Sequence, residues 1–460
     1  MTVSYADQLQ LRRMELLSAY GGRAPRYTSY PTAAQFTPDI GPATYAGWLS
    51  ELPADASVSL YVHVPFCARL CWYCGCNTRA VTRPGVLADY ISLLREEIAL
   101  VEKHLPGPMK AHAIHLGGGT PNMTSVDDLT VLFATLRQVF RVAPGIEIAA
   151  EIDPAQLRPE WVRAAAFHGL SRASLGVQDL SPEVQAAVNR IEPFEVVARA
   201  ARLLRRAGVA SLNLDLMYGL PRQRSAHVLA TLDAVLTLKP DRLALFGYAH
   251  VPWMKPHQRL IDETTLAGDA ERLEQSEAAA ERLAAEGYVR IGLDHYALPH
   301  DELAIALQEG WLRRNFQGYT TDEEGPLIGF GVSAIGETSR GYVQNSADEV
   351  TWRKAVAAGR LPTARGVAVT EDDRLRAELI QRLMCDFAVD VPAVEARQAR
   401  RLAADPMREA ALAGLARDGV IEDTAGVIRI TELGRPFVRQ VCAAFDAYLA
   451  PEALRHSRVV

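Results

Sequence analysis

The sequence predicts an α/β fold built on parallel strands, and two kinds of pattern support this class. Short runs rich in Val, Ile, Leu and aromatic residues recur from residue 58 onward, with turn residues at their ends. Segments with the apolar spacing of an amphipathic helix separate these runs. Strand–helix units in a row are joined by right-handed crossovers, which produce either a barrel or an open doubly wound sheet. Hydrophobic periodicity does not distinguish these two architectures.

Six segments are the strand candidates. They are VSLYVHV at 58–64, AHAIHLG at 111–117, IEIAAEI at 146–152, SRASLGV at 171–177, ASLNLDLMY at 210–218 and RLALFGY at 242–248. Helices are expected between them, because apolar residues share one helical face at 90–101 and again at 129–140. Gly208 and Gly287 stand where two of the helices should end.

Each strand candidate ends in a polar loop. In chain order these loops read PFCARLCWYCGC, GGGTP, EIDP, VQD, DLMYGLP and YAH. Barrels and doubly wound sheets both place active sites at the carboxyl ends of their strands. One polar loop is ordinary, but six with groups able to hold a ligand predict a site at this end of the fold.

The length of 460 residues favours two or three domains over one core. Residues 1–57 read as an irregular arm, rich in Tyr and Pro, that packs on the catalytic barrel or sheet. Residues 58–355 read as the catalytic domain with an extension. We expect a long helix near 267–286 and a further strand at 288–296 in that extension.

Residues 356–460 read as a separate, mostly helical domain that ends in a helix from 436 to 448. Its order of helix, two short strands and helix resembles a winged-helix unit. Residues 361–460 contain 14 Arg, no Lys and 15 Asp plus Glu, so no basic face is available for nucleic-acid phosphates. We therefore expect a structural cap or a substrate lid.

Charge and hydropathy restrict the setting of the protein. The net charge of −6 argues against broad binding to nucleic acid or anionic lipid, but allows small anionic substrates. No basic leader followed by an apolar run, and no uncharged apolar stretch of about 18 residues, occurs in the sequence, so a cytoplasmic location is expected. Thiols stay reduced in that compartment. Cys385 and Cys442 have apolar neighbours and are expected to be buried.

Four of the six cysteines lie within ten positions, at Cys67, Cys71, Cys74 and Cys76. Structural zinc favours four ligands in two pairs, and no second C-x2-C or H-x3-H pair occurs in the sequence. Three thiolates from one loop would leave one iron of a [4Fe–4S] cluster without a protein ligand. We expect Cys67, Cys71 and Cys74 to bind that cluster. Cys76 should lie near it without binding, because C-x-C spacing makes it hard for both sulfurs to reach separate corners.

The spacing C-x3-C-x2-C after the first strand resembles the signature of radical S-adenosylmethionine (SAM) enzymes. The resemblance implies a partial (β/α)6 barrel in which SAM binds the open iron and is cleaved to a 5'-deoxyadenosyl radical. The barrel would exclude water and competing donors from that radical. GGGTP at 117–121 is similar to the strand end that approaches the SAM amino group, and Tyr73 matches the aromatic position that meets the adenine.

Further stretches are similar to the oxygen-independent coproporphyrinogen III oxidase family. They are PRYTSYPTA, YVHVPFC with the cysteine loop, GGGTP, FGYAHVP, IGLDHYA and RNFQGYTT, and the resemblance covers nearly the whole chain. It implies oxidative decarboxylation of two propionates of coproporphyrinogen III to vinyl groups, which gives protoporphyrinogen IX for heme biosynthesis without O2. It also implies two SAM molecules in one site. The positions that match the family's contacts are Tyr61, Tyr73, Gly118, Gly119, Thr120, Glu151, Gln178, Arg190, Asp215, Ala249 and Ile335.

Catalytic roles are expected from this resemblance for Cys76 and Glu151. The substrate carries four carboxylates, so basic or hydroxyl partners are expected in its pocket. Arg26 and Tyr27 in the arm, and Lys255 after the sixth strand, are the candidates.

Two other functions stay open. The chain could be a heme or porphyrin carrier, or a radical SAM enzyme that methylates or opens a tetrapyrrole. Cys76 and the arm favour the oxidase, because the heme-binding sister group typically has an aromatic residue in place of Cys76 and lacks PRYTSYPTA. Tyr73, where Phe is frequent, and WMKPHQRLIDE at 253–263 depart from the commonest oxidase pattern. The expected partners are an external electron donor and acceptor, with no nucleic acid or membrane, and the protein is expected to act as a monomer.

Overall fold

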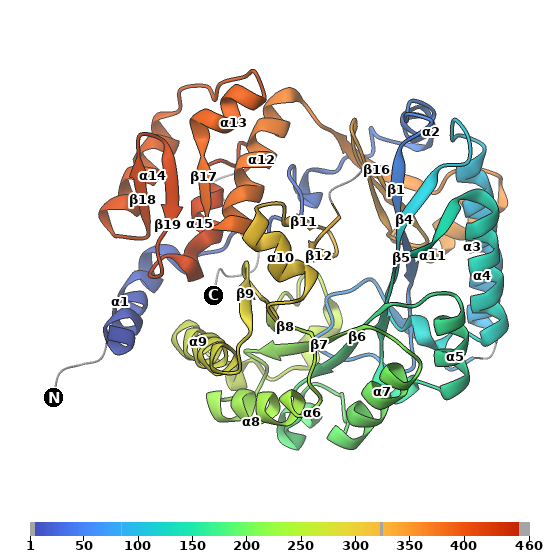
Figure 1. Ribbon diagram of the computed structural model, residues 1–460, viewed down its shortest axis with the longest axis horizontal. Helices are drawn as coiled ribbons and strands as arrows, with labels where there is room; N and C mark the ends of the chain where they lie inside the picture. Colours follow the sequence, from blue (N-terminus) through green and yellow to red (C-terminus); the bar gives the residue numbers. More distant parts are fainter. Residues whose placement is uncertain (1–4, 84, 323–324, 450–460) are drawn as a thin grey trace.

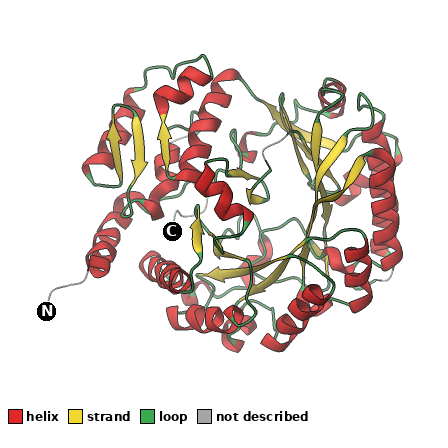
Figure 2. Ribbon diagram, in the orientation of Figure 1, coloured by secondary structure: helices red, strands yellow, loops and turns green. Residues whose placement is uncertain are grey.

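The predicted α/β fold is confirmed by the computed structural model, which describes residues 5–83, 85–322 and 325–449 (Figure 1). A twelve-stranded sheet has the strand order β16-β15-β14-β13-β1-β4-β5-β6-β7-β8-β10-β9. The sheet curves around a central space and carries helices on its outer side (Figure 2). This arrangement is a partial barrel rather than an open doubly wound sheet.

All six strand candidates form parallel strands at the centre of the sheet. Their bounds are β1 Ser57–Val64, β4 Lys110–Gly118, β5 Arg141–Ile152, β6 Arg172–Gln178, β7 Ser211–Tyr218 and β8 Arg242–Gly247. A seventh parallel strand, β13 (Leu327–Phe330), pairs with the other side of β1. The sequence-based prediction missed β13, because LIGF is short and fully apolar and therefore has no alternation to reveal a strand.

Antiparallel strands extend both edges of the parallel core. They are β10 His295–Ala297 and β9 Val289–Ile291 beside β8, and β14 Ile335–Thr338, β15 Gly341–Asn345 and β16 Thr363–Ala368 beside β13. The segment 288–296, predicted as one strand, is instead the hairpin of β9 and β10. Gly292 permits the turn, since its φ of +55° lies in the left-handed region.

The helices that follow the parallel strands cover the outer face of the sheet (Figure 1). Their bounds are α3 Val86–Glu102, α4 Val126–Val139, α5 Pro159–Phe167, α6 Pro182–Ala187, α7 Phe194–Arg206, α8 Ser225–Leu236 and α9 Asp269–Ala285. Gly208 and Gly287 follow α7 and α9 with φ of +88° and +85°, which confirms the predicted helix ends. Among the described residues, no helix combines the length and apolar character needed to cross a membrane.

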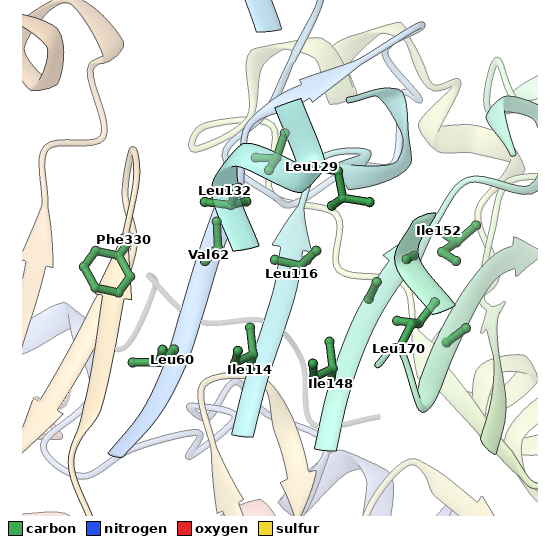
Figure 3. Packing of buried hydrophobic residues seen from close by; sticks show 14 of the residues in the cluster. Leu60, Val62, Ile114, Leu116, Leu129, Leu132, Ile148, Ile152, Leu170 and Phe330 are labelled. Carbon is green, nitrogen blue, oxygen red and sulfur yellow. The ribbon is translucent and has the colours of Figure 1, made fainter. Parts of the chain in front are cut away.

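The main core lies between these helices and the sheet. Apolar side chains on the helix-facing side of β1, β4 and β5 pack against the inner face of α4 (Figure 3). Residues of this contact labelled in Figure 3 are Leu60, Val62, Ile114, Leu116, Leu129, Leu132 and Ile148. Because parallel strands are covered on one face by helices, this burial fixes which side chains point into the central space.

A second core holds the C-terminal part of the chain. It contains α12 Glu371–Asp386, α13 Val391–Arg397, α14 Pro406–Arg417 and α15 Val438–Ala443, with a small sheet of β17 Ala388–Asp390, β18 Ile421–Thr424 and β19 Val427–Ile430. The last predicted helix is shorter than expected. A 3-10 turn, η6 (Arg435–Phe437), precedes α15, and the chain turns after Ala444, where Asp446 accepts a hydrogen bond from the backbone N of Tyr448.

The N-terminal arm joins both cores. The prediction that it is irregular was wrong for about half of its length, because it contains the helices α1 (Tyr5–Tyr20) and α2 (Pro42–Ser50) and the 3-10 turn η1 (Ala33–Gln35). Leu16 and Tyr30 are buried in the C-terminal core, whereas Leu49 is buried against the sheet. The arm therefore runs from the C-terminal part of the molecule across to the barrel.

Candidate active site

A cavity of about 310 Å³ lies in the central space of the barrel. The cysteine loop, the GGGTP strand end and the inner faces of β5 to β8 contribute to its wall. Twelve residues expected at the site line it: Cys67, Cys71, Tyr73, Cys74, Cys76, Gly118, Gly119, Thr120, Glu151, Gln178, Arg190 and Asp215. The structure therefore brings together residues that are up to 148 positions apart in the chain, from Cys67 to Asp215.

The cysteine loop is closed at its base by two short parallel strands, β2 (Phe66–Cys67) and β3 (Arg79–Ala80). Cys67 Sγ lies 3.1 Å from Thr78 Oγ1 across this base. Burial raises the pKa of the Cys67 thiol. A hydrogen bond from Cys76 lowers the pKa of Cys74 to about 7, so this thiol is poised to become a thiolate.

The donor set fits an iron–sulfur cluster. Cys67, Cys71 and Cys74 all face the same cavity. A cubane cluster binds each thiolate at a separate corner, so it requires sulfurs around a shared space rather than around one point. Within residues 5–83, 85–322 and 325–449, no group of three or more His, Cys, Asp or Glu side chains is placed to hold a single metal ion.

The glycines of GGGTP are required by the protein's own packing. A Cβ on Gly118 would lie 2.6 Å from Cε1 of His63, and its φ of +110° is a conformation that other residues rarely adopt. A Cβ on Gly119 would lie 2.7 Å from the carbonyl oxygen of Phe66. The sequence indicated that these glycines admit a ligand. The structure adds that they let β4 approach the base of the cysteine loop.

Glu151 on β5 is held at the cavity by two partners. The backbone N of Gly118 donates to its Oε2 at 2.9 Å, and His115 Nε2 lies 3.5 Å from its Oε1. Burial alone would raise the pKa of Glu151, but these hydrogen bonds and the nearby His115 and His63 keep it below its ordinary value. Glu151 therefore presents an ionised carboxylate to the cavity.

Arg190 links the cysteine loop to acidic groups of the wall. Its Nη1 lies 3.7 Å from Cys71 Sγ, and its Nη2 lies 2.9 Å from the carboxylate of Glu192. Asp153 approaches the same guanidinium at 3.8 Å. Burial raises the pKa of Glu192 to about 7, although the charge of Arg190 opposes that shift. The guanidinium is thus positioned to pair with a ligand carboxylate beside the cysteines.

Asp215 on β7 lies in a polar layer deeper in the barrel. Ser174 Oγ and Asn213 Nδ2 each donate to its carboxylate at 2.7 Å. Burial raises the pKa of Asp215 despite these donors. Gln178, at the end of β6, has a φ of +70°, which turns the chain at the carboxyl end of that strand.

Three expected cofactor residues lie outside the cavity wall. Tyr61 on β1 stacks on His115, with ring centroids 5.7 Å apart, and its hydroxyl lies 3.0 Å from His63 Nδ1. The carbonyl of Ala249 accepts a hydrogen bond from Gln258 at 3.2 Å. Ile335 begins β14, on the far side of β13.

The three expected substrate residues also lie outside the wall of this cavity. Arg26 donates to the carbonyl of Gly247, at the end of β8, at 2.8 Å. Tyr27 is 4% exposed, and its hydroxyl donates to Asp446 in the C-terminal part of the chain at 3.1 Å. Lys255 lies against the cysteine loop, where its Nζ donates to the carbonyl of Cys76 at 2.9 Å.

The sequence analysis did not predict several residues of the cavity wall. They are chiefly His115, Phe246, His295, Gln317 and Tyr319. His115 lies in the same strand as the GGGTP motif and faces the central space, a direction that the alternation of HAIHLG could have revealed. Gln317 and Tyr319 belong to RNFQGYTT, which was recognised as a motif without a role for its individual side chains.

Comparisons with known proteins identify the domains and the relatives of this chain. A model of the radical SAM superfamily matches residues 61–235, and a model of the HemN C-terminal domain matches residues 369–437. The oxygen-independent coproporphyrinogen III oxidase of Bradyrhizobium diazoefficiens is 48% identical over 449 residues, which cover 97% of this chain and 100% of the relative. The corresponding protein of Pseudomonas aeruginosa is 40% identical and covers 97% of this chain and 98% of the relative.

A solved structure is also similar over nearly the whole chain. It is coproporphyrinogen III oxidase (HemN) from Escherichia coli, described as a radical SAM enzyme. The two structures superpose with a TM-score of 0.88 at 35% sequence identity, covering 95% of this chain and 99% of the other.

Proposed function

The chain belongs to the family of oxygen-independent coproporphyrinogen III oxidases, within the radical SAM superfamily, and we propose that it converts coproporphyrinogen III to protoporphyrinogen IX. Removal of a hydrogen atom, one electron and CO2 from each of two propionates leaves two vinyl groups. The superfamily uses a [4Fe–4S] cluster and SAM, and the family is expected to bind two SAM molecules. When bound, these groups supply the ability to remove hydrogen from an unactivated carbon.

The observation that carries this proposal is the placement of three cysteines and a set of polar ligands around one cavity. Cys67, Cys71 and Cys74 would hold the cluster and leave one iron open. Arg190, 3.7 Å from Cys71, would pair with the carboxylate of SAM. Glu151 would accept hydrogen bonds through its ionised carboxylate.

Other residues would orient the ligands and exclude water. Asp215 and Gln178 offer acceptors for ribose hydroxyls, and Tyr73 offers a flat face for the adenine. Cys76 lies next to the cluster site, and its thiol is hydrogen-bonded to Cys74. Arg26 is our candidate for a propionate partner, because it lies at the end of β8 beside the cavity residue Phe246.

The proposal also covers the location, oligomeric state and partners of the protein. The protein would act in the cytoplasm as a monomer, with an external electron donor that reduces the cluster and an external acceptor for the electron released at decarboxylation. No nucleic acid or membrane is needed. The arm and the C-terminal part would cover the barrel opening around the substrate.

The test is an anaerobic assay with reduced protein, SAM and coproporphyrinogen III. We expect a divinyl product and CO2, with methionine released in stoichiometric step. Tight heme binding without turnover would indicate a carrier. A methylated or opened ring would indicate a different tetrapyrrole enzyme, and either result would refute the oxidase.

A further inference from the structure

The segment after β8 crosses the cysteine loop and bonds to its backbone. Lys255 Nζ donates to the carbonyl of Cys76 at 2.9 Å, and His257 Nε2 lies 2.7 Å from the carbonyl of Cys74. Gln258 Nε2 donates to the carbonyl of Tyr73 at 3.0 Å. A carbonyl can only accept, so His257 carries its proton on Nε2 in this contact. Three side chains of one short segment thus bond to three carbonyls within four residues of the loop.

The cysteine loop needs this support because its own strands are short. Regular pairing joins β2 and β3 only through Phe66–Arg79 and Cys67–Ala80. The loop residues between β2 and β3 have no strand partner. Where their backbone carbonyls are buried, those carbonyls need hydrogen-bond donors from other parts of the chain. The 3-10 helix η4 (Pro256–Leu260) and Lys255, which directly precedes it, bring such donors from about 180 residues further along the chain.

The residues of the segment after β8 differ in how deeply they are buried and in how many hydrogen bonds they make. Gln258 is fully buried, and its side chain also bonds to the backbone of Ala249 and Val251. Lys255 and His257 are half-buried, while Met254 is 60% exposed. Lys255 and His257 can therefore be changed without opening a core, whereas Gln258 also holds the segment itself together.

We propose that Lys255 and His257, held in place by Gln258, are positioning residues that keep Cys74 and Cys76 directed into the cavity. The inference rests on the proposed function for the identity of the cluster, but the contacts exist without it. In the metal-free protein they would preorganise the loop for cluster binding. In the loaded protein the Lys255 ammonium would also lie beside the cluster loop and stabilise the added negative charge of the reduced cluster. This role differs from the substrate contact expected for Lys255 from the sequence.

The first test uses the metal-free protein and needs no catalytic activity. At about pH 9, where Cys74 with its pKa of about 7 stays ionised with or without the charge of Lys255, we expect Lys255→Met and His257→Ala each to raise the alkylation rate of Cys74 by iodoacetamide about fivefold, as expected for loss of one hydrogen bond. Arg259→Met is the matched control, because Arg259 is an exposed cation on the same 3-10 helix. The buried Cys385 serves as the internal reference in the mass spectrum.

The second test measures the reduction potential of the reconstituted cluster by EPR-monitored titration. Lys255→Met should shift it to a more negative value, Lys255→Arg should restore it, and Arg259→Met should change it less. Equal alkylation rates and potentials in Lys255→Met and Arg259→Met would overturn the proposal. Failure of wild-type protein to release CO2, with these differences intact, would refute the proposed function but leave the positioning role standing.

Discussion

At the scale of single residues, Glu97 on α3 joins three distant parts of the chain. Its carboxylate accepts hydrogen bonds from the backbone N of Gly331 at 2.8 Å, Asn345 Nδ2 at 2.6 Å and Trp352 Nε1 at 3.0 Å. Glu97 is 1% exposed, and burial raises its pKa to about 7 despite these donors. The residue therefore fixes an outer helix to the strand that flanks β1.

Replacing Glu97 with Gln should destabilise the protein by about 1–3 kcal/mol, because the amide NH2 cannot accept the hydrogen bond from Asn345. Urea-induced unfolding of the metal-free protein measures the difference. Glu102→Gln, an exposed change at the end of the same helix, should leave the unfolding midpoint unchanged.

The loss of unfolding free energy in Glu97→Gln should also depend on pH. The folded pKa of Glu97, about 7, is above its ordinary value of 4.5, so the stabilisation by the protonated carboxyl is complete below about pH 4.5 and is lost as the pH rises through 7. The stability difference between the wild type and Glu97→Gln should shrink between about pH 5 and pH 8. A difference that grows over this range would mean that the three donors lower the pKa instead.

Cys76 provides a second prediction at this scale. Cys76→Ser should keep the iron content of anaerobically reconstituted protein near that of the wild type, since Cys76 is exposed and is not one of the three expected ligands. Activity should fall at least tenfold, because Cys76 lines the cavity beside the three ligands and is expected to be a catalytic residue. Cys71→Ser is the comparison that should lose the cluster. Equal iron loss in both variants would make Cys76 a ligand.

Site residues that belong to a short motif could be predicted from the sequence. The four clustered cysteines, and Gly118 and Gly119 of GGGTP, line one cavity as their spacing and their strand ends predicted. The contacts of Lys255 and Tyr27 could not be predicted from the sequence, because their partners Cys76 and Asp446 lie 179 and 419 positions away in the chain. Such contacts depend on how the elements pack, which no local pattern encodes.

At the scale of elements, β4 ends in a backbone geometry that the cysteine loop depends on. Gly118 packs against the ring of His63, and His63 Nε2 lies 3.0 Å from the carbonyl of Asn77, just after Cys76. The end of β4 is therefore linked through one ring to the end of the cysteine loop.

Gly118→Ala should cost about 1–3 kcal/mol, since alanine is strained at φ of +110° and its Cβ would displace the His63 ring. We expect a lower melting temperature and weaker SAM binding by equilibrium dialysis. Gly75→Ala is the control within the cysteine loop, where an added Cβ would have no heavy atom within 4 Å. Unchanged melting in Gly118→Ala would show that β4 can relax around the methyl group.

Element prediction succeeded where strands were long enough to show a pattern. The six candidates from 58 to 248 match the observed strands closely, apart from β5, which begins earlier at Arg141. The short strands β13 and β14 to β16 pair with partners that sequence cannot name. The hairpin at 288–296 was read as one strand because its turn contains only three residues between β9 and β10.

At the scale of the whole molecule, the arm is attached to the C-terminal core by hydrogen bonds as well as by packing. Arg439 on α15 is 3% exposed and donates to the carbonyls of Ala24 and Pro25. The Tyr27 hydroxyl donates to Asp446, and Tyr30 Oη accepts from the backbone N of Ala447. Movement of the arm should therefore be coupled to movement of this C-terminal core.

Arg439→Ala should release the arm, because two buried carbonyls lose their donor. Limited trypsin digestion should cut the arm after Arg23 or Arg26 several times faster than in the wild type. Arg429→Ala, an exposed change on β19, is the matched control. Equal cleavage of the two variants would show that packing of Leu16 and Tyr30 holds the arm by itself.

The position of β1 between β4 and β13 determines when its strand pairing can be completed during synthesis of the chain. The strand that leads into the cysteine loop leaves the ribosome early, but one of its two neighbours is translated only when residues 327–330 appear. The donors from η4 also emerge well after the cysteines that they hold. The cysteine loop can therefore reach the bonded conformation described above only after most of the polypeptide has been made.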